Sequence, residues 1–233
     1  MRSRAFRNAL LRDLPLAEHE LIAQMAQSVT FRPLEHLVEK DRIINHVHFL
    51  EEGWASVMFM SGIRPVEVAM VGVEGVIGLS FFLGAQIAMN SCYMQTSGTG
   101  HRVAAARLQA ALPALSTFRQ RIMGYARDRL LQSYEALAAA TVGSIEARVA
   151  RTILLCHDRV SNDDIHITQD QLARKVGANR AGVTSALHLL ESQNIIQSRR
   201  RCVRVVDRSR LEGAAAGTYA RAIAAPLASA VIL

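Results

Sequence analysis

Four arginines lie close together near the C-terminal end of the chain, in a segment that is otherwise β-prone. The sequence QSRRRCVRVVD, residues 197–207, carries Arg199, Arg200, Arg201 and Arg204 among valine residues. A two-stranded hairpin of this composition would hold guanidinium groups at its tip, where they can neutralise nucleic-acid phosphates. We therefore predict a basic wing that lies against phosphates. The alternative is a hairpin whose arginines are only solvated.

The residues before the wing predict two helices joined by a sharp turn, in the sequence ITQDQLARKVGANRAGVTSALHLLESQNII, residues 167–196. Thr168 followed by Gln171 is the pattern of a capping box, which starts a helix. Gly177 stands where the chain must turn with a positive φ, and Asn179 can cap the second helix. Apolar residues at helical spacing predict the inner faces of both helices, namely Leu172, Ala173, Val176, Val183, Ala186, Leu187 and Leu190. The small Ala173 would let the two helices cross closely, so the segment predicts a helix-turn-helix.

The positive charge of the chain is concentrated in the same half. The formal net charge is +7, and residues 1–110 contain 10 Lys and Arg against 10 Asp and Glu. Residues 145–233 contain 13 basic and 8 acidic residues, so this part carries most of the excess. Such a distribution favours a polyanionic partner, although a solvated basic face would give the same count.

Composition argues against several other classes of protein. With 50% hydrophobic and 20% charged residues, the chain has the composition of a globular protein and not of a disordered one. Cys92, Cys156 and Cys202 are scattered without zinc or iron–sulfur spacing, which argues against a disulfide scaffold and favours a cytoplasmic location. We expect no cofactor. The lack of an apolar stretch of about 18 residues predicts that the chain does not associate with a membrane.

The first 142 residues predict three kinds of element. Apolar residues recur at helical spacing over residues 4–28. Short apolar runs with glycines between them then favour a sandwich or barrel, and the runs are Phe31–Val38, Val47–Leu50, Ala55–Met60, Val66–Val71, Tyr93–Thr96 and His101–Ala105. Residues 113–142 follow a near-heptad pattern, and a helix of this length spans roughly 45 Å. We expect this helix to pair with its copy in a homodimer, the alternative being an ordinary core helix.

Over residues 14–212 the chain resembles the Crp/Fnr family of bacterial regulators. The segments that carry the resemblance are VHFLEEGWASV at 47–57, GVEGVIG at 72–78, EARVAR at 146–151, the helix-turn-helix, and DRSRLE at 207–212. The resemblance implies an α+β fold with an N-terminal double-stranded β-helix (a β-roll), a long dimerisation helix and a C-terminal winged helix-turn-helix.

The resemblance also divides the chain into four predicted parts. These are a β-roll sensor domain with an N-terminal helix at 1–112, the dimerisation helix at 113–143, the DNA-binding domain at 144–212 and a tail at 213–233.

The recognition helix of the family opens with a small capping residue, an Arg and a Glu, and carries Ser or Gly and then Arg further on. Here Asn179 matches the cap and Arg180 the first Arg, whereas Ala181 replaces the Glu and Thr184–Ser185 replace the later pair. Arg180 is therefore the candidate for a bidentate contact with guanine, and Thr168 and Asn179 for phosphate contacts. The predicted DNA-binding residues are Thr168, Gln169, Asn179, Arg180, Thr184, Ser185, His188, Arg199, Arg200 and Arg201.

The sensor half departs from the cyclic-nucleotide binders of the family. Those proteins hold the ribose with a Glu and the cyclic phosphate with an Arg–Ser pair, and here Leu79 and Asn90 stand at the Glu and Arg positions, before Ser91. A cyclic phosphate without its cation would be held poorly, so we expect another signal, which the sequence leaves unknown. The iron–sulfur branch of the family needs an N-terminal cysteine cluster that this sequence lacks. Haem would need a histidine ligand, for which the candidates are His36, His46, His48 and His101.

Two other functions remain open from the sequence. His46, His48 and Glu52 resemble the H-x-H-x3-E metal motif of cupins, which would make the chain a metalloenzyme, although Lys40 and Phe59 stand where cupin glycines would be. The other alternative is a β-roll interaction protein whose helix-turn-helix no longer binds DNA.

The prediction that we carry forward is a sequence-specific transcription regulator and not an enzyme. A homodimer would place two recognition helices in successive major grooves, ~34 Å apart, on a near-palindromic site of double-stranded DNA. RNA polymerase is the expected protein partner. A signal in the β-roll would act through a hinge near Gly143.

Overall fold

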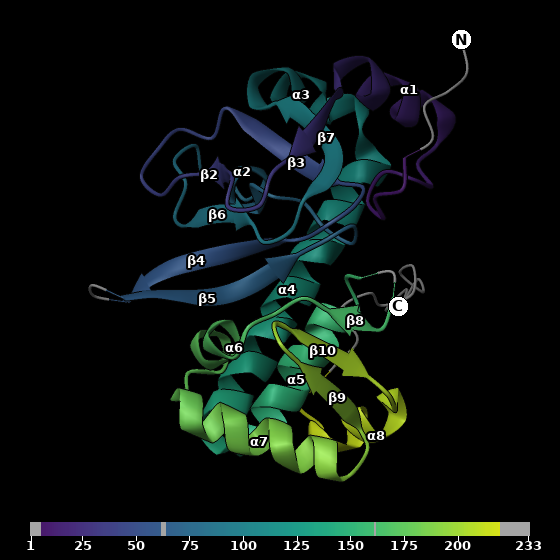
Figure 1. Cartoon of the computed structure of the whole chain (residues 1–233). Coiled ribbons are helices and arrows are strands. Elements are labelled where there is room, and N and C mark those ends of the chain that lie inside the picture. Colours follow the sequence, from purple (N-terminus) through teal and green to yellow (C-terminus); the bar gives the residue numbers. More distant parts are fainter. Residues whose placement is uncertain (1–5, 62–63, 161, 220–233) are drawn as a thin grey trace, which may run out of the picture. The chain divides into compact units, whose positions relative to one another are not determined.

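The computed structural model describes residues 6–61, 64–160 and 162–219, and Figure 1 labels its helices and strands. These residues form two compact units, one that ends at Arg129 and one that begins at Leu130. This division falls inside a helix, and the predicted division into four parts stays a prediction. None of the described helices is long and apolar enough to cross a membrane. The predicted tail at 213–233 lies outside the described residues from position 220 onward.

The first unit contains two antiparallel sheets that pack together as a β-roll. One sheet has the strand order β1-β7-β3, with β1 at Gln27–Phe31, β7 at Gly98–Ala104 and β3 at His46–Leu50. The other has the order β2-β6-β4-β5, with β2 at His36–Val38, β6 at Ser91–Met94, β4 at Ala55–Ser61 and β5 at Arg64–Val71. Apolar side chains of both sheets form one buried cluster, which includes Phe31, Leu50, Ala55, Val71, Ile77, Cys92 and Met94. The predicted β-roll is therefore confirmed.

Helices cover the other face of the β1-β7-β3 sheet. They are α1 at Leu16–Met25, α3 at Ala105–Ala111 and the first part of α4 at Ser116–Val142, and the short α2 lies at Leu79–Phe82. Phe49 of β3 and Phe118 of α4 are fully buried, with ring centroids 6.0 Å apart. Burial of such aromatic side chains on an apolar sheet face holds the helices to the roll.

Two predicted elements of this unit are shorter than the sequence pattern indicated. The helix predicted at 4–28 begins only at Leu16, because Pro15 cannot donate a backbone hydrogen bond within a helix and instead takes the N-cap position. The strand predicted at Phe31–Val38 is divided into β1 and β2, because the chain turns between them at Leu34 with φ 67°. Leucine rarely adopts a positive φ, so the sequence does not predict a turn at Leu34.

The long helix also begins later than predicted. A 3₁₀ turn at Leu112–Ala114 precedes it, and α4 starts at Ser116. The buried carboxylate of Glu18, on α1, accepts hydrogen bonds from Thr117 N at 2.9 Å and Phe118 N at 2.8 Å. Burial raises the pKa of Glu18, but these backbone hydrogen bonds outweigh it, so the pKa lies below its usual value. A distant side chain therefore caps this helix and fixes where it begins.

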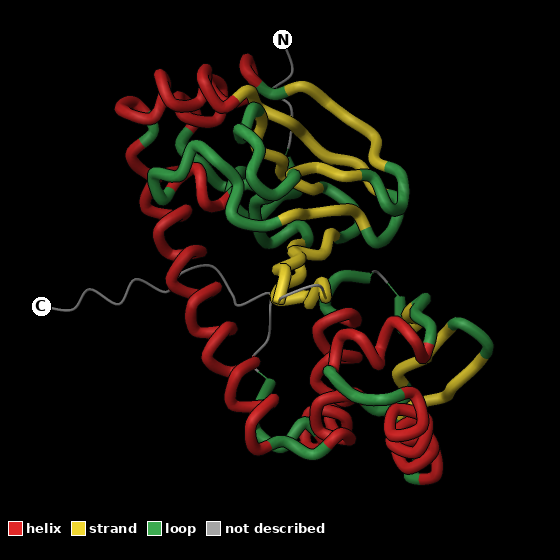
Figure 2. The backbone as a smooth tube through the Cα atoms, turned by 90° about the vertical axis from the view of Figure 1, so that its left-hand side faces the viewer, coloured by secondary structure: helices red, strands yellow, loops and turns green. Residues whose placement is uncertain are grey.

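The second unit contains the last part of α4 and a winged helix domain. Its helices are α5 at Ile145–His157, α6 at Gln169–Val176, α7 at Arg180–Ser192 and α8 at Arg208–Ala214. A small antiparallel sheet has the order β8-β10-β9, with β8 at Asp164–Ile165, β10 at Cys202–Val205 and β9 at Ile196–Arg199. Figure 2 shows these helices in red beside the yellow strands. Ser144 caps α5 as predicted, because its Oγ accepts a hydrogen bond from Ala147 N at 3.1 Å.

Candidate nucleic-acid interface

The first helix of the predicted helix-turn-helix, α6, begins at the predicted capping box. Thr168 Oγ1 accepts a hydrogen bond from Gln171 N at 3.1 Å, and Gln171 Oε1 accepts one from Thr168 N at 2.8 Å. The reciprocal bonds satisfy two backbone donors at the start of the helix. The next side chain, Gln169, is half-buried and accepts a hydrogen bond from the Thr184 hydroxyl at 3.1 Å. Gln169 therefore ties the start of α6 to α7.

The turn between α6 and α7 forms as the sequence predicts. Gly177 has φ 63°, and Ala178 N donates to Ala173 O at 3.1 Å. A Cβ at Gly177 would meet no atom within 4 Å, so glycine is favoured here by its backbone angle and not by crowding. Asn179 Oδ1 then accepts a hydrogen bond from Gly182 N at 2.8 Å and caps α7.

A close approach that the sequence analysis missed lies at Gly182, in the first turn of α7. A Cβ at this glycine would lie 2.9 Å from Cδ1 of Ile145 on α5. Since real Cβ atoms do not come that close, the glycine lets α7 pack directly against the start of α5. The sequence signal was the glycine itself, at a position inside a helix where glycine costs stability. It places the exposed face of α7 relative to the rest of the domain.

The two faces of α7 differ sharply in exposure. Val183, Ala186, Leu187 and Leu190 are buried, as predicted. The side chains of the other face are exposed, and they are Arg180, Ala181, Ser185, His188 and Leu189. Thr184 is half-buried, and its hydroxyl also lies 2.9 Å from Arg180 O, so this side chain is engaged within the domain. The exposed face of α7 therefore offers hydrogen-bonding side chains from Arg180, Ser185 and His188, next to the apolar Ala181 and Leu189.

The predicted wing is the hairpin of β9 and β10. The register pairs Arg199 with Cys202, so Arg200 and Arg201 form a two-residue turn, in which Arg201 has φ 61°. Three consecutive arginines, Arg199 to Arg201, are exposed at this tip. The hairpin is held to α7 by Glu191, whose Oε1 accepts a hydrogen bond from Ser198 N at 2.8 Å.

The fourth arginine of the wing has a partner within the sheet. Arg204 lies opposite Asp164 in the β10–β8 register and binds its carboxylate through two hydrogen bonds of 2.8 and 3.0 Å. The hydrogen bonds from Arg204 lower the pKa of Asp164. A bidentate pair of this kind joins the wing to β8. Arg204 therefore differs from Arg199–Arg201, although all four were grouped in the sequence.

Six of the ten predicted DNA-binding residues line one groove between α6, α7 and the wing, whereas Asn179, Thr184, Ser185 and His188 do not line it. The groove has a volume of about 360 Å³ and is lined by Thr168, Gln169, Asp170, Arg180 and Arg199–Arg201, among others. Arg180 Nε lies 3.8 Å from Asp170 Oδ1, and both side chains are more than half exposed. This loose contact costs little to break, so the guanidinium can turn toward another partner.

Comparison with known families identifies the domain that carries this groove. The profile of the Crp-like helix-turn-helix domain matches residues 147–214. The domain that carries the groove is therefore similar to the Crp-like helix-turn-helix domain over these residues. The resemblance to the Crp/Fnr family stated from the sequence is thereby confirmed. No curated protein matches the chain in sequence.

Solved structures share the fold of the chain beyond the Crp-like domain. FixK2 from Bradyrhizobium japonicum is 17% identical with a TM-score of 0.70, over 81% of this chain and 96% of that one. The c-di-GMP-responsive global regulator CLP of Xanthomonas campestris is 15% identical with a TM-score of 0.67, over 82% of this chain and 99% of its own. A CRP-family transcriptional regulator from Thermus thermophilus is 17% identical with a TM-score of 0.67, over 81% and 96%. At sequence identities of 15–17%, the similarity to these structures shows that the chain shares their fold.

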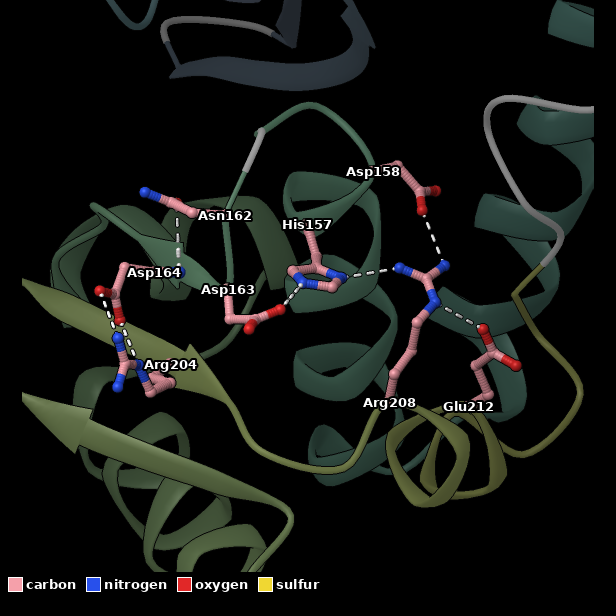
Figure 3. A network of polar contacts seen from close by, with 8 residues as sticks. All are labelled: His157, Asp158, Asn162, Asp163, Asp164, Arg204, Arg208 and Glu212. Carbon is pink, nitrogen blue, oxygen red and sulfur yellow. Dashed lines mark hydrogen bonds and ion pairs between the residues drawn. The ribbon is translucent and has the colours of Figure 1, made fainter.

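A polar network that the sequence did not predict joins α5 and α8 of the Crp-like domain (Figure 3). Arg208 of α8 donates to Asp158 Oδ1 at 2.7 Å, to Glu212 Oε1 at 2.9 Å and to His157 Nδ1 at 2.7 Å. Because arginine only donates, His157 Nδ1 must accept, and its Nε2–H donates to Asp163 Oδ1 at 3.1 Å. The network joins α8 and the end of α5 to the residue before β8, the strand that pairs with the wing. Arg208 lies in the DRSRLE segment, to which the sequence gave no role.

The cupin-like metal triad does not form in the first unit. Glu52 Oε1 accepts a hydrogen bond from Arg7 at 2.7 Å, and both side chains are exposed. His48 is buried within the β-roll, where its ring centroid lies 6.4 Å from that of His46. Across residues 6–61, 64–160 and 162–219, no three His, Cys, Asp or Glu side chains are grouped to hold a metal ion. The residues of the H-x-H-x3-E pattern are therefore not grouped as a metal site in the part of the chain that the structure describes.

The positions that match the cyclic-nucleotide binders are used for other contacts. Leu79 opens α2, and Ser91 Oγ accepts a hydrogen bond from Lys40 N at 3.1 Å. Gly75 packs against the Tyr125 ring of α4, so closely that a Cβ there would overlap the ring. None of these contacts tests which signal acts on this β-roll, so that expectation stays a prediction.

Burial of His48 predicts an acid-sensitive β-roll. Burial, with the nearby charges of His46 and Arg102, lowers the pKa of His48 from 6.5 to about 4. Between these values the unfolded chain binds a proton that the folded roll does not, so stability falls as the pH falls from 6.5 to 4, by about 3 kcal/mol in full. Urea unfolding followed by Trp54, the single tryptophan, which is buried in this unit, measures the loss. The His48→Phe variant should show a shallower pH dependence than the wild type. The exposed His188→Gln variant is the control, and equal slopes for all three proteins would contradict the prediction.

Proposed function

We propose that the chain is a sequence-specific DNA-binding transcription regulator that acts as a homodimer on a near-palindromic site. The observation that carries the proposal is the convergence of Arg180, the start of α6 and the three wing-tip arginines on one groove of the Crp-like domain. A recognition helix in the major groove, flanked by phosphate contacts from a wing, uses this arrangement. The transcriptional regulator of the CRP family and the regulator CLP, which have a similar fold, support it at the level of architecture.

Each predicted contact has a role in this proposal. Arg180 would read guanine, and Ser185 and His188 would face base edges or phosphates from the same side of α7. Thr168, Gln169 and Asn179 lie at the N-termini of α6 and α7, where backbone N–H groups favour phosphate. Thr184 would act mainly by holding Arg180 and Gln169 in place, through the two contacts of its hydroxyl.

The test of the proposed function is selection of binding sites from genomic DNA by the purified full chain, followed by gel shift. We expect enrichment of a motif with two inverted half-sites about one helical turn apart. If the intact protein enriches no motif and does not bind duplex DNA even at low salt, the proposed function is wrong, and the interaction-protein alternative replaces it.

The second half of α4 supports a homodimer. Leu130, Tyr134 and Leu137 are 52%, 59% and 66% exposed, at the i, i+4 and i+7 spacing of a helical stripe. Three large apolar side chains along one exposed stripe are unusual for a monomer and typical of a coiled-coil seam. The copy of the same helix is the partner that this seam would fit.

Carboxylates on this stripe are expected to separate the dimer. Leu130→Glu with Leu137→Glu places like charges in the proposed seam, and because both positions are exposed, the fold of the protomer should be unchanged. Sedimentation velocity should show a monomer, and affinity for a two-half-site DNA should fall at least tenfold. The control is Gln109→Glu, which adds a carboxylate to the exposed surface of α3. A double variant that still sediments as a dimer would place the dimer interface elsewhere.

A further inference from the structure

The β-roll contains a large open cavity that is separate from the positions matched to the cyclic-nucleotide site. The cavity has a volume of about 840 Å³ and lies beside β1, β2, β3 and the connection at residues 41–45. Its walls include neither Leu79, Asn90 nor Ser91. A space of this size is within the range of small-molecule sites in proteins. It is formed entirely by the first unit.

A buried histidine with one unpaired ring nitrogen lies in the wall of this cavity. His48 is only 7% exposed, and its Nδ1 is buried without a hydrogen-bond partner in the structure. A buried polar atom in this state costs free energy, so such atoms in folded proteins are usually paired. His48 lines the cavity, and a small turn of its ring would expose Nδ1 to a ligand that carries a hydrogen-bonding group.

Two arginines that line the cavity are candidates for binding an anionic group. Arg102 lies opposite His48 in the β3–β7 register. Its Nε donates to Gln27 Oε1 at 3.0 Å, and its two Nη groups are the donors that a carboxylate binds in a bidentate pair. Arg42 lines the same cavity.

Two of the carboxylates that line the cavity are already engaged. Glu35 accepts a hydrogen bond from Arg32 N at 2.8 Å, and Asp41 lies 3.6 Å from Lys40 Nζ. They therefore offset the positive charge of Arg102 less than a count of residues suggests, and Glu39 is the third carboxylate of the lining. His48 itself is neutral at pH 7, because burial lowers its pKa to about 4, so it contributes a hydrogen-bonding group and not a charge.

The opposite part of the cavity is apolar and includes an aromatic ring. Phe31 is 3% exposed, and its ring centroid lies 5.9 Å from that of His48 in an edge-to-face arrangement. Leu37, Val38 and Ile44 complete this apolar wall. Aromatic and aliphatic walls next to a few aligned polar groups are the usual composition of a site for a planar organic ligand.

We propose that this cavity binds a small aromatic carboxylate, with its acid group on Arg102 and His48 and its ring against Phe31. The site would be the sensor of the proposed regulator, but its ligand binding does not depend on DNA binding, and each can be measured without the other.

The test is calorimetric titration of the full chain with benzoate and naphthoate, each against its neutral amide. We expect saturable binding of at least one carboxylate, with the matching amide at least about tenfold weaker, because the amide cannot form the charge-assisted bonds. The imidazole nitrogen signals of His48 should shift on addition of the carboxylate. No saturable binding of either acid, or equal binding of acid and amide, would overturn the proposal.

Variants locate the ligand on the proposed residues. Arg102→Gln should weaken the carboxylate at least about tenfold, whereas Arg107→Gln on exposed α3 should leave its affinity unchanged. Arg102 is exposed, so the variant should fold, and Arg102→Lys should recover part of the affinity by restoring the charge. Unchanged affinity in Arg102→Gln would show that the acid binds elsewhere and would contradict the proposal. Gel shifts of the same variants without ligand report separately on DNA binding.

Discussion

Replacement of Arg180 by alanine is expected to abolish sequence-specific DNA binding while leaving the dimer intact. The side chain is 69% exposed at the first position of α7, next to the groove that the wing arginines share. A bidentate contact between arginine and guanine contributes about 1–3 kcal/mol of discrimination. A dimer loses two such contacts, so affinity for the selected site should fall by roughly 30-fold to 20,000-fold. Affinity for random duplex should change much less, since it depends on phosphates.

Gel shift on the selected site and on random duplex measures the two affinities, and sedimentation reports the oligomeric state. The matched control is Arg107→Ala, which removes an exposed arginine from α3 of the β-roll. A change of the base pair that Arg180 contacts should lower the affinity of the wild type for the site, whereas the affinity of the Arg180→Ala variant should not change. If Arg180→Ala binds the selected site as the wild type does, the recognition role belongs to another residue of α7.

Features that depend on near neighbours in the chain were predictable. The capping box at Thr168, the positive φ of Gly177 and the cap at Asn179 each involve residues at most five positions apart, so their sequence pattern nearly determines their geometry. Burial of one face of α7 followed from helical periodicity for the same reason. The helix-turn-helix could therefore be identified together with its exposed face.

Features that depend on distant partners were not predictable. The pair of Arg204 with Asp164 joins residues 40 positions apart, and only the strand register shows that they meet. The contact of Gly182 with Ile145 likewise requires knowing how α7 crosses α5. The Arg208 network and the unpartnered Nδ1 of His48 depend on packing that no local pattern records. The sequence thus located the interface, whereas the structure shows which of its arginines are engaged within the fold.

Arg204 binds Asp164 within the sheet, whereas Arg199, Arg200 and Arg201 lie at the wing tip. This difference leads to a second expected result with a large effect. Neutralising the wing tip by Arg199→Ala, Arg200→Ala and Arg201→Asn should flatten the salt dependence of DNA binding. Asparagine suits position 201 because it tolerates the positive φ of the turn. Each lost phosphate contact reduces the slope of log affinity against log salt by about 0.9, so a dimer that loses six contacts should change by about 5. Affinities for specific and random duplex should fall together, because phosphate contacts carry no sequence information.

The control for this result uses the arginine that the sheet already holds. The double variant Arg204→Ala with Asp164→Ala removes a basic residue from the same hairpin together with its ion-pair partner, so the net charge is unchanged. If the tip contacts phosphates and Arg204 does not, this variant keeps the wild-type slope while the tip variant loses it. DNA affinity is measured as a function of salt concentration for the wild type, the tip variant and the double variant, and the three slopes are compared. An unchanged slope for the tip variant would mean that the wing arginines are only solvated, which is the alternative that the sequence left open.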